Sequence, residues 1–253
     1  MQPIEGFSVL VTGGGSGLGA AVARHMAARG ARVTICGRRA ERLAAVARDI
    51  GPNCHAEPGD IARAGDRARI VAAALAHGGG LQGLVNAAAN MLQGEITALE
   101  EARLLDILHV NVVAGMMMTG LCVPHLARDG GAVVFFGSVH ARRSFPRASP
   151  YAASKGAVEV LARVLAAELG PKGIRVNCII PGAVPTEINV RAGLATPESN
   201  LARLKSMEED HPLGRIGRPE EIAEAVDYLL RAQWTTGAAL VVDGGLSLGM
   251  SRK

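Results

Sequence analysis

Seven short apolar runs, rich in β-branched residues, alternate with longer helical stretches along the sequence. The runs are nearly continuous in apolar character, which is typical of strands buried on both faces of a sheet. The alternation predicts βαβ units, and hence an α/β fold: a doubly wound parallel sheet of about seven strands with helices on both faces. The predicted strands are 7–12, 32–36, 53–57, 83–86, 132–137, 175–180 and 240–243, and the predicted helices are 17–29, 40–50, 61–77, 100–128, 151–170 and 219–230.

No internal repeat, charge block or linker rich in Pro or Ser divides the 253 residues. We therefore predict a single domain over 1–253, because open α/β sheets of this length often stay undivided. The stretch 184–213 interrupts the alternation, since it is long, polar and irregular for a connection. Connections of that length in compact domains are usually lids or binding loops, so we predict a substrate-binding loop there.

A glycine-rich turn follows the first predicted strand directly. Residues 12–19 read Thr-Gly-Gly-Gly-Ser-Gly-Leu-Gly, and a predicted helix comes next. Such a turn lets backbone amides approach a pyrophosphate at the positive end of the helix. A tight turn with no ligand is the alternative, but its place after strand one of a βαβ pattern favours a Rossmann-type dinucleotide site. The predicted contacts are Gly13, Gly15, Ser16, Gly17, Leu18 and Gly19.

The end of the second predicted strand bears on the choice of dinucleotide. An acidic residue there would bind the ribose 2′-hydroxyl of NAD, but this chain has Gly37-Arg38-Arg39. Two guanidinium groups suit a 2′-phosphate through charge-assisted hydrogen bonds. Arg39 can equally be a solvated residue at the start of the next helix, and Ser16 stands where another Arg would have helped. The sequence favours NADP(H), with NAD(H) as the alternative.

Tyr151 and Lys155 stand four residues apart at the start of a predicted helix, so their side chains share one face. A phenol that exchanges protons near neutral pH needs a lowered pKa, which an adjacent ammonium would provide. Ser138 follows a predicted strand at the edge where open α/β sheets bind ligands, and its hydroxyl would bond a substrate carbonyl. Tyr occurs twice and Lys four times in the chain, so only about 0.03 such pairs are expected by chance.

With these motifs in place, the sequence resembles the short-chain dehydrogenase/reductase family in its single-domain form, almost from end to end. The matching positions are 12–19, Asp60, Asn86 to Ala89, Asn111, Ser138, Tyr151, Lys155, 174–177, 181–186, 236–237 and 243–245. The resemblance implies an NAD(P)(H)-dependent oxidoreductase that moves a hydride between nicotinamide and a substrate carbonyl or secondary alcohol. A nucleotide-sensing protein without turnover, on the same scaffold, is the alternative.

The resemblance also implies a role for each matching residue. Tyr151 would be the general acid or base, Ser138 would polarise the substrate oxygen, Lys155 would lower the Tyr151 pKa and bind ribose, and Asn111 would hold a water in a proton relay. An alternative for Asn111 is a buried helix residue that caps a kink. The implied cofactor contacts are Asp60 and Ile61 with adenine, Asn86, Ala87 and Ala88 on the adenosine side, and Pro181, Gly182, Val184 and Thr186 near the carboxamide. The sequence 86–89 departs from the family's usual Asn-Asn-Ala-Gly.

The substrate stays open between a 3-oxoacyl thioester and a sugar, because residues 214–221 resemble many branches and Ser138-Val139-His140 resembles sugar dehydrogenases. Arg142, Arg143 and Arg147 lie near the expected mouth of the site, where they would attract an anionic substrate or form a solvated basic loop.

Composition and residue spacing argue against several other classes of function. The net charge of +4 is spread over interspersed acidic and basic residues and aromatics are 3%, so we expect no nucleic-acid partner. Seven scattered His and four separated Cys indicate no metal site and a reducing, cytoplasmic location. The longest apolar tract, 110–123, is shorter than a bilayer span, so we expect no membrane partner. Family resemblance and the small residues of the two long helices, 100–128 and 151–170, suggest a homotetramer.

Overall fold

The computed structural model describes residues 1–126 and 130–249, and these contain one seven-stranded sheet. All strands are parallel, in the order β3-β2-β1-β4-β5-β6-β7, which confirms the predicted doubly wound architecture. The strands are β1 Ser8–Thr12, β2 Arg32–Gly37, β3 Cys54–Pro58, β4 Gly83–Asn86, β5 Ala132–Phe136, β6 Arg175–Pro181 and β7 Ala239–Val242. The chain reverses its direction of growth between β1 and β4, where open sheets of this type bind ligands.

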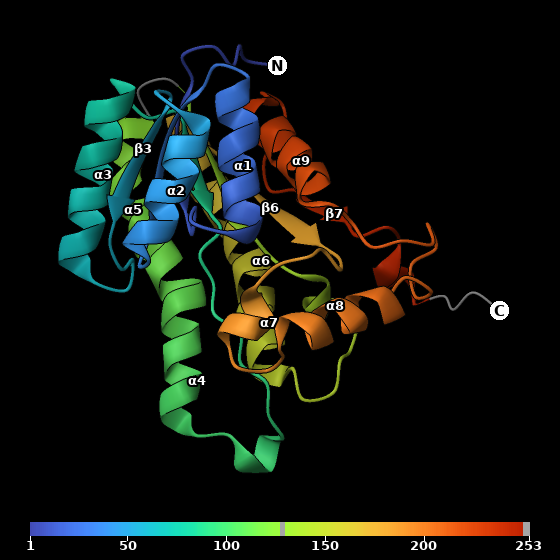
Figure 1. Ribbon diagram of the computed structural model, residues 1–253. Helices are drawn as coiled ribbons and strands as arrows, with labels where there is room; N and C mark the ends of the chain where they lie inside the picture. Colours follow the sequence, from blue (N-terminus) through green and yellow to red (C-terminus); the bar gives the residue numbers. More distant parts are fainter. Residues whose placement is uncertain (127–129, 250–253) are drawn as a thin grey trace.

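Helices cover both faces of the sheet (Figure 1). The residues of α1 Gly17–Ala28, α2 Ala40–Ile50 and α9 Pro219–Arg231 pack with one set of strand side chains into a first core. Those of α3 Ala64–Gly78, α5 Ala114–Leu126 and α6 Ser149–Leu169 pack with the alternate side chains into a second core. A sheet buried on both faces explains why the strands read as unbroken apolar runs rather than as alternating ones.

The predicted elements differ from the observed ones mainly at their ends. The third predicted helix begins at Ala64 rather than at residue 61, because residues 60–63 form a turn in which the Arg63 amide donates to the Asp60 carbonyl at 2.9 Å. Asp66 then accepts from the Asp60 amide at 2.8 Å, which ties the first turn of α3 to that loop. Side-chain bonds of this kind fix helix ends and have only a faint sequence signal.

The stretch 184–213 is less irregular than predicted, since it contains α7 Ile188–Arg191 and α8 Pro197–Ser206. Thr196 caps α8, accepting from the Ser199 amide at 3.2 Å, and Pro197 occupies the first helical turn. Thr-Pro is a sequence signal for the start of a helix. It was missed because the whole stretch 184–213 is polar in composition. In Figure 1 both helices lie together at the end of the molecule to which β6 points.

The predicted helix 100–128 is observed as α4 Glu101–Leu108, a π-helical turn over His109–Val113, and α5; its last two predicted residues lie outside the described residues. By length and composition alone, the continuous helix Glu101–Leu126 is able to cross a membrane, with a mean hydropathy of 1.6 and 39% burial in its most apolar stretch. The tract 110–123 is part of this longer helix, as the predicted helix 100–128 implied, and the absence of a membrane partner stays a prediction. A core helix of a soluble protein passes the same test.

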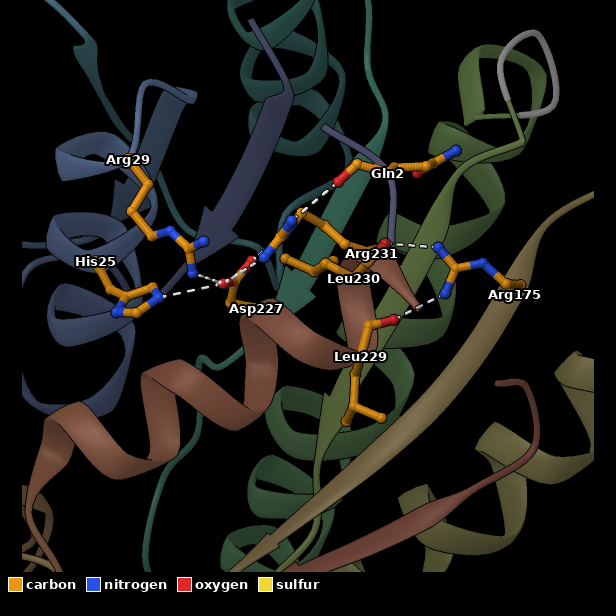
Figure 2. Close-up of polar contacts among 8 residues, drawn as sticks. All are labelled: Gln2, His25, Arg29, Arg175, Asp227, Leu229, Leu230 and Arg231. Atoms are coloured by element: carbon orange, nitrogen blue, oxygen red, sulfur yellow. Dashed lines mark hydrogen bonds and ion pairs between the residues drawn. The ribbon is translucent and has the colours of Figure 1, made fainter. Parts of the chain in front are cut away.

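A polar network ties α9 to α1, β6 and the N-terminal segment (Figure 2). Asp227 is buried and bonds to Arg231 at 2.5 and 3.0 Å, and it also contacts His25 and Arg29. The Arg175 guanidinium donates to the carbonyls of Leu229 and Leu230, at 2.8 and 2.5 Å. Arg175 therefore satisfies carbonyls at the end of α9 that have no partner within the helix.

Candidate active site

A cleft opens at the carboxyl edge of the sheet, and a second groove continues from it along the ends of β1 and β2. Both are lined by the glycine turn and by residues that follow β4, so they form the two parts of one elongated site. The predicted residues that line them are Gly13, Gly15, Ser16, Gly17, Leu18, Gly19, Arg38, Arg39, Asp60, Ile61, Ala87, Ala88, Ser138, Tyr151, Lys155, Pro181, Gly182, Val184 and Thr186.

The glycine turn brings backbone unusually close to neighbouring backbone. A Cβ at Gly19 would lie 2.5 Å from the Gly13 carbonyl oxygen, and one at Gly13 would lie 2.9 Å from Ala88 Cα. Gly13 and Gly17 also have φ values of +70° and +54°, in the left-handed region that disfavours other residues. The turn thus delivers the first amides of α1 to the floor of the cleft, which fits a pyrophosphate.

The far groove is basic where it meets the end of β2. Arg38, Arg39 and Arg191 all line it, and the charges of the first two lower the pKa of Arg191 further than its burial alone does. Arg39 donates to Ser16 Oγ at 2.9 Å and pairs with Glu187 at 3.4 Å. The two residues directly after β2 are Arg38 and Arg39 rather than an acid, so the residues present fit a dinucleotide, including one with a 2′-phosphate.

The substrate part of the cleft brings Ser138, Tyr151 and Lys155 together. Ser138 follows β5, while Tyr151 and Lys155 lie in the first two turns of α6, and all three are at most 8% exposed. The Lys155 ammonium donates to the Phe136 carbonyl at 2.8 Å and lies 5.6 Å from the centre of the Tyr151 ring. The predicted arrangement is therefore present, with the ammonium held by the strand beside the phenol.

The pKa values of this pair are set first by burial. Burial raises the pKa of Tyr151 to about 12, although a hydrogen bond with Ser138 opposes the rise. Burial also lowers the pKa of Lys155 to about 8. Desolvation therefore sets the direction of the Tyr151 pKa in this structure, and the expected role of Lys155 in lowering that pKa stays a prediction.

His140 is a further member of the site to which the sequence analysis gave no role. Its Nδ1 lies 3.2 Å from Ser138 Oγ, and its ring meets the Tyr151 ring edge-on with 5.3 Å between centres. The Phe145 ring lies against the His140 ring at a tilt of 32°, with 4.4 Å between their centres. Burial, with the nearby charge of Arg203, lowers the His140 pKa to about 4, so the imidazole is neutral at pH 7. The only sequence signal was its place two residues after Ser138.

Comparison with known proteins decides the family. A family model described as enoyl-(acyl carrier protein) reductase matches residues 13–247. Dehydrogenase/reductase SDR family member 4 of Sus scrofa is 38% identical, with 96% of this chain and 88% of that protein covered. This chain is a short-chain dehydrogenase/reductase. As such it is an NAD(P)-dependent oxidoreductase.

Other relatives of this dehydrogenase/reductase differ in their substrates by name. L-fucose dehydrogenase of Bos taurus is 34% identical, with 97% and 91% of the two chains covered. The solved structure of a 3-ketoacyl-(acyl-carrier-protein) reductase from Brucella melitensis, complexed with NADH, has a TM-score of 0.87 and 32% identity, covering 96% of this chain and 99% of that one. The family and the nicotinamide cofactor are thus established, whereas the substrate has to be argued from this chain's own cleft.

Asn111 lies in the π-helical turn, apart from the main cleft. Its amide nitrogen donates to the Asn90 carbonyl and to Ser154 Oγ, both at 3.0 Å, and its oxygen accepts from the Asn90 amide at 2.7 Å. Both donor hydrogens are therefore used, and one lone pair of the oxygen remains for a water. Asn111 and Lys155 line the same small internal cavity, so the geometry accommodates the structural role and the relay role together.

Asn86 faces the interior rather than the predicted adenosine contact. It lines the small internal cavity and donates to Thr119 Oγ1 at 3.2 Å, while neither part of the elongated site includes it. The next residues, Ala87 and Ala88, do line the cleft, and the Ala88 amide donates to Thr12 Oγ1 at 3.1 Å. The altered sequence 86–89 therefore presents backbone and methyl groups to the cofactor groove.

The arginines between Ser138 and Tyr151 lie away from the cleft. Arg142 bonds to Glu159 at 2.5 Å, and Arg143 pairs with Asp210 at 3.4 Å. Arg147, whose φ is +67°, lines neither part of the site. Two of these three charges are therefore balanced by carboxylates, which supports the interpretation of a solvated basic loop. Within residues 1–126 and 130–249, no group of three or more His, Cys, Asp or Glu is placed to hold a metal ion.

We expect the buried Lys155 ammonium to lower the unfolding free energy at neutral pH. Its pKa falls from 10.5 in the unfolded chain to about 8 in the fold, so folding opposes the charged form by about 3 kcal/mol below pH 8. This cost disappears as the pH rises from 8 through 10.5. We predict that the unfolding free energy of the wild type rises by about 2–3 kcal/mol relative to Lys155→Met between pH 7 and pH 10, as measured by urea unfolding at one protein concentration.

The matched control is Lys172→Met, which removes an exposed ammonium from the turn after α6. Its stability difference from the wild type should stay constant over the same pH range. If the Lys155→Met difference were equally constant, the buried ammonium would not carry the cost assigned to it.

Proposed function

We propose that this enzyme reduces a substrate carbonyl to a secondary alcohol with NADP(H), using Tyr151 as the proton donor. The observation that carries the proposal is the convergence of Ser138, Tyr151 and Lys155 beside a groove built for a dinucleotide. A nicotinamide dinucleotide bound in that groove supplies or accepts the hydride. Residues 184–213, which contribute α7 and α8 to the cleft, would form its substrate-binding side.

Each polar side chain has a distinct task in this reaction. Ser138 donates its hydroxyl hydrogen to the substrate oxygen, and Tyr151 delivers a proton to the same oxygen as negative charge develops there. The raised Tyr151 pKa of about 12 keeps the phenol protonated at neutral pH, the form required of a general acid. The buried Lys155 ammonium stabilises the phenolate left behind. A protonated phenol beside a buried ammonium suits the reduction of a carbonyl.

Removal of the Tyr151 hydroxyl should abolish most turnover and leave the cleft intact. We predict that Tyr151→Phe lowers kcat by about 10²–10⁴-fold, the contribution of a positioned general acid. The assay follows NADPH absorbance with a panel of small ketones, 3-oxoacyl thioesters, aldoses and steroids. NADPH fluorescence should show unchanged cofactor binding in the variant.

Tyr228→Phe is the matched control, because it changes the other Tyr of the chain, which lies on α9 and is 45% exposed. It should leave kcat unchanged. Turnover by Tyr151→Phe at the rate of the wild type would contradict the proposed mechanism. Cofactor binding without turnover of any carbonyl or alcohol in the panel would instead favour the nucleotide-sensing alternative.

We infer a preference for NADP(H) from the basic end of the groove. Arg38 is exposed there and donates weakly to Asn90 Oδ1 at 3.4 Å, which leaves most of its guanidinium available. Arg39 is shared between Ser16 and Glu187, so a 2′-phosphate would compete with Glu187 for it. Arg38 is therefore the better candidate for the residue that selects the phosphate.

Arg38→Asp should weaken NADPH more than NADH. We predict that kcat/KM for NADPH falls by about 10–100-fold, the effect of losing a charge-assisted hydrogen bond, and that the value for NADH changes little. Fluorescence titration should give a matching rise in the Kd of NADPH. Arg48→Asp, an exposed charge at the other end of α2, is the control. An unchanged preference in Arg38→Asp would remove Arg38 as the selector.

We further propose that the enzyme is a cytoplasmic homotetramer with no membrane or nucleic-acid partner. The outer faces of the two long helices expose apolar side chains that a second copy would cover, including Met117 at 50% and Val164 at 57% exposure. The four cysteines are unpaired, which suits a reducing compartment. We predict a light-scattering mass four times the 26.1 kDa of the chain, and a lower mass for Met117→Glu with Val164→Glu. A monomeric wild type at micromolar concentration would contradict the tetramer.

A further inference from the structure

The wall of the cleft formed by 184–213 carries both apolar and polar side chains. The residues that line it are Val184, Thr186, Glu187, Ile188, Asn189, Arg191, Arg203, Leu204 and Met207. Leu204 is buried in a small core with Val139, which fixes α8 against the segment after β5 and thereby fixes the neighbouring Arg203 at the same wall. Glu187, the one carboxylate among these lining residues, pairs with Arg39 and Arg42 rather than with Arg203.

Arg203 has no balancing carboxylate among the described residues, since no Asp or Glu oxygen there forms an ion pair with it. Its one hydrogen bond is a weak contact from Nη1 to Met207 Sδ, at 3.5 Å. Arg191, the other arginine of the cleft, extends into the cofactor groove and donates to the Ala89 carbonyl at 3.1 Å. Arg203 is therefore the cation that remains for a substrate.

The Arg203 side chain is open to the cleft. The residue is exposed and lines the same cleft as Ser138 and Tyr151, so an anion bound in that cleft can reach its guanidinium. Its charge also acts on His140, whose Nδ1 lies 3.2 Å from Ser138 Oγ. The cation and the residues that would hold the reacting carbonyl therefore line one cleft.

We propose that Arg203 binds a carboxylate of the substrate, and that the enzyme accordingly reduces compact oxo acids to hydroxy acids. The substrate would place its ketone oxygen at Ser138 and Tyr151 and its carboxylate at Arg203, with a short apolar body between them. A guanidinium suits this task because its planar donors match a carboxylate bidentately.

The alternatives fit this placement less well. A sugar offers no anion for Arg203, and an acyl thioester carries its phosphate many bonds away from the reacting carbonyl. Because Arg203 lines the same cleft as Ser138 and Tyr151, an oxo acid that carries its carboxylate on its own body suits the site better than either of them. This inference rests on the proposed carbonyl reduction and adds the class of substrate to it.

The test compares charged and neutral forms of one substrate. Oxo acids of four to six carbons are assayed with NADPH against their own methyl esters, in the wild type and in Arg203→Gln. We expect the wild type to prefer the acids, and Arg203→Gln to lower kcat/KM for the acids by about 10–100-fold, mainly through KM, while the esters change less than about threefold.

The control is Lys205→Gln, which removes a charge of the same sign from an exposed position of α8 outside the cleft. It should leave both substrates unaffected. Calorimetric titration of a hydroxy acid into the protein with NADP⁺ gives a second readout, in which Arg203→Gln should raise the Kd by a similar factor and Lys205→Gln should not.

The outcomes separate this inference from the proposed function. If acids and esters react equally well and Arg203→Gln alters neither, or if only sugars or thioesters react, the carboxylate site is refuted while carbonyl reduction stands. If no carbonyl compound is reduced, or if Tyr151→Phe retains full activity, the proposed function itself fails.

Discussion

The hydrogen-bonded ladder of seven parallel strands is the constraint on which the site depends. Because all strands run in one direction, the residues that follow β1, β2, β4, β5 and β6 emerge at one edge of the sheet. The glycine turn, the arginines after β2, Ala88, Ser138 and the segment after Pro181 come together for this reason. Antiparallel pairing of even one inner strand would send its loop to the opposite edge. The shared direction of the strands therefore brings these positions together, whatever side chains they carry.

Most of the fold could be predicted from the sequence because its strand, helix and turn signals agree with one another. Apolar runs marked the strands, helical periodicity marked the layers between them, and the glycine turn marked the reversal point. The Tyr151–Lys155 pair could be predicted because a four-residue spacing on a helix is a local property. The composition of the chain, with few Tyr and few Lys, made that pair specific.

The rest depended on contacts between segments distant in the sequence. The role of His140 requires the positions of Phe145 and Tyr151 around its ring, and the place of Arg203 requires the packing of Leu204 on Val139. Asn86 shows the same limit, since the family resemblance implied a contact in the cofactor groove but its side chain lines the small internal cavity and donates to Thr119. The direction of the Tyr151 pKa was also beyond the sequence, because burial is a sum over the whole fold.

The position of the polar network around Asp227 and Arg175 determines which parts of this fold tolerate substitutions during evolution. It lies where β6 begins, whereas the cleft lies where the strands end, and among the described residues no member of the network lines the cleft. Changes at sites without shared partners add almost independently. Substitutions on the cleft side of α8 therefore leave the polar network at the other edge of the sheet intact. One fold can in this way accommodate many substrate preferences.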